Sequence, residues 1–156
     1  MLPQGYNANL LIVQGPGYVA IEQEMIHDVR IIPTDQRPHL PANIRSYLGD
    51  SRGHWEGNTL VVDTTNFKGP VTFREFEAGQ ELHVVERFSR TSDDTISYQF
   101  TVSDPSTWEK SWSGELPITK VDGQVFEYAC QEGNYGMANI LSGARATEAE
   151  AAAKKN

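Results

Sequence analysis

The chain has 156 residues, of which 38% are hydrophobic, and its 13 basic against 21 acidic residues give a formal net charge of -8. This length predicts a single domain, and a mean hydropathy of -0.48 is typical of a soluble protein. No concentrated block of Lys and Arg precedes the tail, which argues against a nucleic-acid-binding surface and against a basic membrane-surface helix.

Targeting and redox signals are few. No apolar run is long enough for a membrane-spanning helix, and residues 1–20 lack the pattern of a signal peptide. We therefore expect either a cytoplasmic protein or one whose targeting segment has been removed. Cys130 is the single cysteine, so an intramolecular disulfide is excluded.

The first third of the chain predicts a short antiparallel meander. Residues 9–14 and 18–25 flank Gly15-Pro16-Gly17, which is typical of a hairpin, and residues 29–32 predict a third strand before Pro33. The Pro-rich run 34–41 predicts a loop. Residues 42–48 predict one short helix, with Asn43 as its N-cap.

The stretch from Gly49 to Phe67 carries the densest set of signals. The pattern from Asp50 to Gly53 predicts a tight Asx-type turn that carries Arg52 outward, and Gly57-Asn58 predicts a two-residue hairpin turn before a strand over 59–67. One interpretation is a surface ion-pair cluster of Asp50, Arg52 and Glu56 that braces a loop. The other is a preorganised rim in which Arg52 binds an anion.

The second half continues with strands. Residues 82–90 and 95–102 predict two of them, and the second alternates apolar and polar side chains, which is typical of a half-buried antiparallel strand. Further strands are expected over 108–121 and 124–131, followed by a helix over 135–146. The domain is thus expected to span 1–146, with a flexible Ala/Glu/Lys tail over 147–156.

These elements predict an all-β, mainly antiparallel fold. We expect the meander to close into a lipocalin-like barrel or half-barrel, and a β-sandwich is the alternative.

Several motifs together resemble a large family of uncharacterised bacterial proteins. They are the Gly49–Phe67 stretch, Tyr6-Asn7-Ala8-Asn9, Glu24-Met25-Ile26-His27, Arg37-Pro38-His39-Leu40-Pro41, Leu82-His83-Val84-Val85-Glu86-Arg87-Phe88, Ser103-Asp104-Pro105-Ser106-Thr107-Trp108 and Tyr128-Ala129-Cys130-Gln131-Glu132-Gly133-Asn134-Tyr135. The resemblance spans the chain to about residue 146. It implies export to the periplasm or outside the cell and a further strand-forming segment upstream, and it implies no known activity. Without that strand a sheet edge lies open, so we expect a homo-oligomer.

Two glutamates are candidate acid–base groups. Glu86 shares a strand face with apolar neighbours, and Glu127 does so in the predicted strand 124–131. A carboxyl group in an apolar interior is suited to general acid or base work. The alternative is that each is neutralised by a nearby arginine, such as Arg30 or Arg87, or accepts a hydrogen bond from a tyrosine.

The histidines support a weaker hypothesis. A metal site needs several donors that converge, and the sequence has no HExxH or CxxC pattern, so no metal or cofactor is predicted. Glu24 and His27 converge only if their strand ends at Met25. A pair formed by His27 and His39 at a pocket mouth is the favoured arrangement.

The sequence thus favours a small-molecule-binding β-barrel, either a binding protein or a cofactor-independent acid–base enzyme of the lyase or hydrolase type. The alternative is a non-catalytic structural protein that self-assembles through exposed strand edges. The candidate catalytic residues are Glu24, His27, His39 and Glu86. The candidate ligand-binding residues are Arg30, Asp50, Arg52, Trp55, Glu56, Tyr98, Trp112 and Glu127.

Overall fold

The computed structural model describes residues 8–73, 76–129, 133 and 135–154. The chain divides into two compact units, Met1–Phe126 and Glu127–Asn156. All described strands belong to the first unit, and the second contains the helix α1 (Gly136–Ala153). The fold is mainly antiparallel β, as the sequence predicts.

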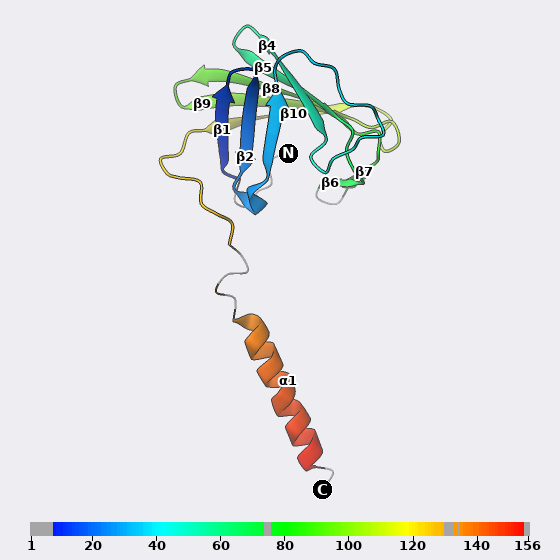
Figure 1. The fold of residues 1–156 in the computed structure, drawn as a ribbon, viewed down its shortest axis with the longest axis vertical. Helices are drawn as coiled ribbons and strands as arrows, with labels where there is room; N and C mark the ends of the chain where they lie inside the picture. The colour runs from blue at the N-terminus through cyan, green and yellow to red at the C-terminus, as the bar shows by residue number, and fades with distance from the viewer. Residues whose placement is uncertain (1–7, 74–75, 130–132, 134, 155–156) are drawn as a thin grey trace. The chain divides into compact units, whose positions relative to one another are not determined.

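Two antiparallel sheets make up most of the first unit (Figure 1). The three-stranded sheet has the order β1-β2-β3, and the five-stranded sheet has the order β10-β9-β8-β5-β4. The strands of the first are β1 (Leu10–Gly15), β2 (Tyr18–Gln23) and β3 (Val29–Pro33). Those of the second are β4 (Asp50–Glu56), β5 (Thr59–Thr65), β8 (His83–Ser92), β9 (Thr95–Ser103) and β10 (Trp112–Thr119). A small hairpin of β6 (Val71–Phe73) and β7 (Phe76–Ala78) lies between β5 and β8 in the sequence.

Turn chemistry sets the hairpins as predicted. Gly15 pairs with Tyr18 across the β1–β2 turn, and Glu56 pairs with Thr59 across Gly57-Asn58. Gly57 adopts a φ of 58°, the left-handed conformation that such two-residue turns require. The predicted meander and the Gly57-Asn58 hairpin are confirmed.

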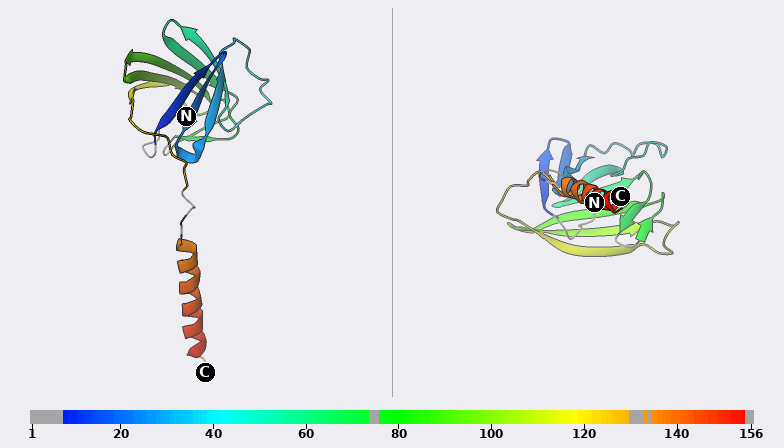
Figure 2. Two further views of the ribbon diagram at one scale, coloured as in Figure 1. Left: turned by 60° about the vertical axis from the view of Figure 1, so that its left-hand side comes forward. Right: turned by 90° about the horizontal axis from the view of Figure 1, so that it is seen from below.

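The core lies between the two sheets, which form two layers in Figure 2. Period-2 alternation directs one apolar face of each sheet inward. The first cluster joins both sheets through Val19, Ile21, Ile32, Leu60, Val62, Phe88 and Tyr98. A second cluster packs Phe67, Ala78, Leu82, Val84 and Val102 together. The predicted inward face of the strand at 95–102 is confirmed by the burial of Tyr98 and Val102.

The sheets approach closely where β3 lies beside β4. A Cβ added to Gly53 would lie 2.8 Å from Cγ2 of Ile32 and 3.1 Å from Cγ2 of Thr34. The missing side chain of Gly53 therefore lets β4 contact β3.

The outer face of the three-stranded sheet is mostly apolar, with Glu22 between Leu11 and Val29 as a charged member. Leu11, Val13, Tyr18, Val29 and Ile31 alternate with the inward residues, and their exposed fractions lie between 42% and 56%. Within the described part of the chain, this sheet thus presents apolar side chains on both faces.

Two predictions around residue 50 are wrong. Residues 42–48 form no helix, because backbone hydrogen bonds tie Ser46 to Asn66 and Lys68 and hold this segment against the end of β5. Asp50–Gly53 is not a tight turn, because Asp50–Glu56 pairs in continuous register with β5. The hydrogen bonds of the β4–β5 ladder therefore hold residues 50–53 in an extended conformation instead of the predicted Asx-type turn.

The C-terminal predictions also need correction. Residues 124–129 contain no strand, and 130 and 131 lie outside the described residues. The first compact unit ends at Phe126, and the helix belongs to the second. The helix begins at Gly136 and continues to Ala153. Residues 147–153, which were expected to belong to a flexible tail, are therefore helical, in keeping with their Ala and Glu content. Among the described residues, no helix has the length and apolarity to cross a membrane.

Candidate functional site

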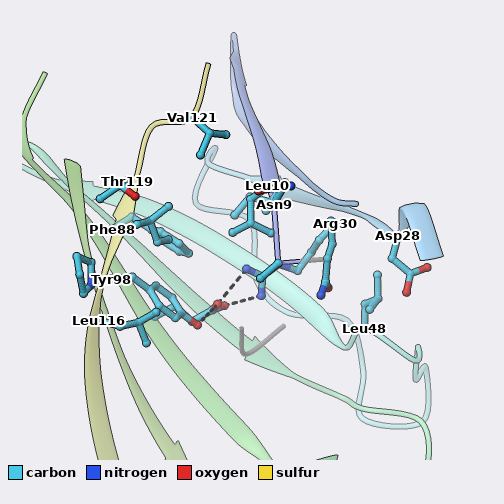
Figure 3. A pocket seen from close by; sticks show the side chains of 16 residues that line it. Asn9, Leu10, Asp28, Arg30, Leu48, Phe88, Tyr98, Leu116, Thr119 and Val121 are labelled. Carbon is cyan, nitrogen blue, oxygen red and sulfur yellow. Dashed lines mark hydrogen bonds and ion pairs between the residues drawn. The ribbon is translucent and has the colours of Figure 1, made fainter. Parts of the chain in front are cut away.

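A cavity of about 260 Å³ lies next to the first core cluster. Its deepest lining residues are buried: Ile21, Arg30, Glu86, Phe88 and Tyr98. Its mouth is formed by exposed residues: Asn9, Asp28, Pro117, Thr119 and Val121. Figure 3 shows Leu10, Phe88, Tyr98 and Leu116 around this space.

Three polar side chains meet at the deep end, and we name them the buried triad: Arg30 from β3, Glu86 from β8 and Tyr98 from β9. Arg30 binds Glu86 in a bidentate manner, with Nη1–Oε2 at 2.5 Å and Nη2–Oε1 at 3.1 Å. The Tyr98 hydroxyl donates to Glu86 Oε1 at 2.8 Å. The exposed fractions of the Arg30 and Glu86 side chains are 9% and 1%. The triad therefore links the two sheets through a desolvated, fully paired charge.

The environment also fixes the state of the phenol. Burial raises the pKa of Tyr98 far above its usual value, and the negative charge of Glu86 raises it further. Tyr98 thus remains a hydrogen-bond donor to Glu86 throughout the physiological pH range. The inward orientation of Glu86 is confirmed, and so is its pairing with Arg30 and a tyrosine. Arg87 instead binds Glu56 at 2.6 Å, outside the cavity.

A second polar group, which we name the outer cluster, lies on the opposite face of the five-stranded sheet. It links Arg52, Asp50, His39, Asp63 and His83 in that order. Arg52 Nη1 lies 2.6 Å from Asp50 Oδ1, and His39 bridges Asp50 and Asp63 with both ring nitrogens at 2.9 Å. His83 Nε2 lies 2.9 Å from the second oxygen of Asp63.

The outer cluster holds the loop before β4 against the sheet. Asp50 accepts a hydrogen bond from the Leu40 backbone, and the Arg52 guanidinium donates to the carbonyl of Pro38 at 2.9 Å. Arg52 pairs with Asp50, as the ion-pair interpretation of this stretch expects, whereas Glu56 pairs with His54 and Arg87 instead.

The free energy of unfolding is expected to fall as pH rises from about 6 to about 8.5, because His83 loses its proton and with it the ion pair with Asp63. Its hydrogen bond with Asp63 raises the pKa of His83, and the same bond lowers the pKa of Asp63. A histidine whose pKa is higher in the folded than in the unfolded protein stabilises the fold at pH values below its unfolded-state pKa. This stabilisation is lost as pH rises through its folded-state pKa. The Asp63 contribution is lost only as pH falls through a value below 3.8. Since both side chains are partly exposed, we expect less than about 1 kcal/mol.

The measurement is urea denaturation of the wild type and of His83→Gln at both pH values. The variant is expected to lose less stability than the wild type over this interval. Equal losses in the two proteins would show that the His83–Asp63 pair does not carry the pH dependence.

The structure separates the predicted catalytic residues. Only Glu86 lines the cavity. Glu24 is buried and accepts a hydrogen bond at 2.7 Å from Asn9, which lines the cavity. His27 is exposed in the short turn η1 (Met25–His27), and His39 belongs to the outer cluster. Among the described residues, no interaction joins the two histidines.

The predicted ligand-binding residues divide in the same way. Arg30 and Tyr98 line the cavity, whereas Asp50 and Arg52 lie in the outer cluster. Glu56 binds His54 and Arg87 on that same outer face.

The remaining three lie elsewhere. Trp55 borders a separate opening near the β4–β5 turn. Trp112 packs edge-on against Phe100 and Trp108, with ring centroids 5.7 and 5.8 Å apart. Glu127 is exposed in the second compact unit.

Sequence reasoning missed several residues of both sites. The cavity walls include Leu10, Leu116 and Ile118, and the alternation of apolar residues along β10 was the available signal. Asp63 was missed in the outer cluster, although it pairs in register with Arg52. Its charge in a strand whose other members are all uncharged was the signal for it. In the described ranges, no group of three or more His, Cys, Asp or Glu side chains is arranged to hold a metal ion.

Comparison of the chain with protein-family models, with curated proteins and with solved structures gave no match in any of the three.

Proposed function

We propose that the protein binds a small, largely apolar molecule in the cavity between the sheets. The observation that carries this proposal is the combination of apolar walls with the buried triad at the deep end. Ligand sites in proteins are concave and mostly apolar, with a few fixed polar groups that orient the ligand. A volume of about 260 Å³ suits a ligand of modest size.

The triad supports a binding role better than acid–base catalysis. Glu86 accepts hydrogen bonds from Arg30 and from Tyr98, so proton transfer to a ligand would require one of these bonds to break. A fixed, paired set of polar groups is instead suited to orienting a ligand. We therefore place binding ahead of the lyase or hydrolase hypothesis.

Filling the cavity is expected to weaken binding. Leu116 lines the cavity from β10, so the larger side chain of Leu116→Trp would occupy part of the space. With benzyl alcohol as a small, mostly apolar probe, we expect binding to weaken by about tenfold or more, measured by ¹⁵N chemical-shift titration. The matched control is Glu115→Trp, because Glu115 points to the other face and binds Ser97. Equal affinity in the two variants would contradict the assignment of the cavity as the binding site.

We also propose that the two sheets form a lipocalin-like half-barrel rather than a sandwich. The close contact at Gly53 between β3 and β4 supports continuous curvature from one sheet into the other. The separate strand order of the two sheets, with β1 and β10 as edges, supports an open rather than a closed barrel.

A second candidate function is self-assembly through the three-stranded sheet. It is favoured by the exposed apolar residues on the outer face, which include Leu11, Val13 and Ile31. Contiguous apolar surface of this kind is typical of protein–protein contacts. We take a second copy of the chain as the partner.

Light scattering across micromolar concentrations tests self-assembly. The wild type is expected to have a dimeric or larger mass, and Ile31→Lys is expected to lower that mass because it places a charge on the apolar face. Lys substitution at His54, which is exposed on the other sheet, is the control. A monomeric wild type would exclude this function.

A further inference from the structure

The charges that line the cavity exclude a large class of ligands. Among its described lining residues, those with acidic or basic side chains are Asp28, Arg30 and Glu86. Arg30 and Glu86 neutralise each other in the buried triad, and Asp28 at the mouth adds one negative charge. The cavity therefore presents no net positive charge to a ligand, in a protein whose formal net charge is -8.

A carboxylate ligand would also compete with Glu86. The guanidinium edge that would bind a carboxylate in a bidentate manner already holds Glu86 through Nη1 and Nη2. If a ligand displaced Glu86, a carboxylate that is 1% exposed would lose its ionic partner. Burial of an unpaired charge is strongly unfavourable, so the exchange is disfavoured.

The triad nevertheless keeps hydrogen-bonding capacity for an uncharged group. A guanidinium has five N–H donors, and the contacts with Glu86 use only two of them. The Tyr98 oxygen, which donates its hydrogen to Glu86, still has lone pairs that can accept. Nearer the mouth, Asn9, Gln23 and Thr119 add uncharged polar groups to the lining.

We propose that the cavity selects an uncharged, mostly apolar ligand with one hydrogen-bonding oxygen, such as an alcohol, a ketone or an amide, and discriminates against carboxylates. This inference rests on the proposed binding function. The oxygen of the ligand meets the free donors of Arg30 and the Tyr98 oxygen, while the apolar part packs against Phe88, Leu116 and Ile118.

Three probes with one carbon skeleton test the ligand class: benzyl alcohol, benzoate and benzylammonium. Each is titrated into the ¹⁵N-labelled full chain at neutral pH, and shifts of the Leu116, Ile118 and Thr119 amides report on the cavity. Benzyl alcohol is expected to bind about tenfold or more tightly than either charged probe, because an unpaired charge of either sign loses its water against the apolar walls, and the single carboxylate of Asp28 at the mouth is exposed and so offsets little of that cost for the cation. Tighter or equal binding of benzoate or benzylammonium at these amides would overturn the ligand class but leave the binding function in place. If no probe shifts these amides, the binding function itself fails.

Glu86→Gln supplies a second test of the electrostatic reasoning. Glutamine keeps the shape of Glu86 and removes its charge, so Arg30 becomes an uncompensated cation. The affinity for benzoate is expected to rise about tenfold, whereas that for benzyl alcohol changes little. An unchanged benzoate affinity in a folded variant would overturn the role of the triad in charge selection. Should this variant fail to fold, the three-probe series on the wild type decides alone.

Discussion

Replacing Glu86 with leucine is expected to lower the free energy of unfolding by about 3–5 kcal/mol. The variant keeps the guanidinium of Arg30 in a site where its side chain is only 9% exposed, and it removes the carboxylate that pairs with it. It also removes the acceptor of the Tyr98 hydroxyl. The cost comes mainly from the unpaired buried cation, since leucine itself suits an apolar interior. Urea denaturation at neutral pH measures the difference.

Two control variants separate this explanation from a general effect of the substitution. Glu115→Leu makes the same chemical change at an exposed position of β10, and it is expected to change stability by less than about 0.5 kcal/mol. The double variant Arg30→Met/Glu86→Leu removes both charges and is expected to recover most of the loss. If the double variant is no more stable than Glu86→Leu alone, the unpaired cation is not the cause.

Gly49→Ala is expected to cost about 2–4 kcal/mol, for two independent reasons. Gly49 has a φ of 73°, a conformation that disfavours any side chain. A Cβ at this position would also lie 2.8 Å from the Thr65 carbonyl oxygen and 2.7 Å from Cγ2 of Thr64. The backbone atom cannot rotate away, so the end of β5 must shift. Chemical denaturation of the variant gives the cost.

Gly57→Ala is the matched control for this prediction. Its φ of 58° is similar, but an added Cβ there meets nothing within 4 Å. It is expected to cost only the conformational part, about 1–2 kcal/mol. If Gly57→Ala loses as much stability as Gly49→Ala, the close contacts of the added Cβ at position 49 do not contribute to its cost.

The parts of the fold that follow from local pattern were predictable from the sequence. The alternation from Ile96 to Val102 specifies one inward face, and Gly57-Asn58 specifies a hairpin turn, so both follow from period and turn chemistry. The segment 42–48 was not predictable in this way. Its backbone bonds to residues 66 and 68 come from tertiary packing, which overrides a weak helical preference.

The same distinction holds for the sites. The inward orientation of Glu86 follows from its apolar neighbours at alternate positions, and a buried carboxylate requires a partner. Which of the arginines pairs with it depends on how two sheets pack, since Arg30 lies 56 residues away in the sequence. The outer cluster was unpredictable for a related reason. Its bridge forms only when the loop bearing His39 folds over β4 and β5, and no sequence pattern specifies that docking.

The junction between the two sheets has a consequence for the folding pathway. Among the described strands, no ladder of backbone hydrogen bonds joins the three-stranded sheet to the five-stranded sheet, so side chains such as those of the buried triad hold the two together. The hairpin β8–β9 is local in sequence, whereas the union of the sheets requires closure of a long loop. The five-stranded sheet can therefore form first, and β1–β3 can add to it as a separate cooperative unit. Opening of that unit alone would uncover the cavity without unfolding the rest of the molecule.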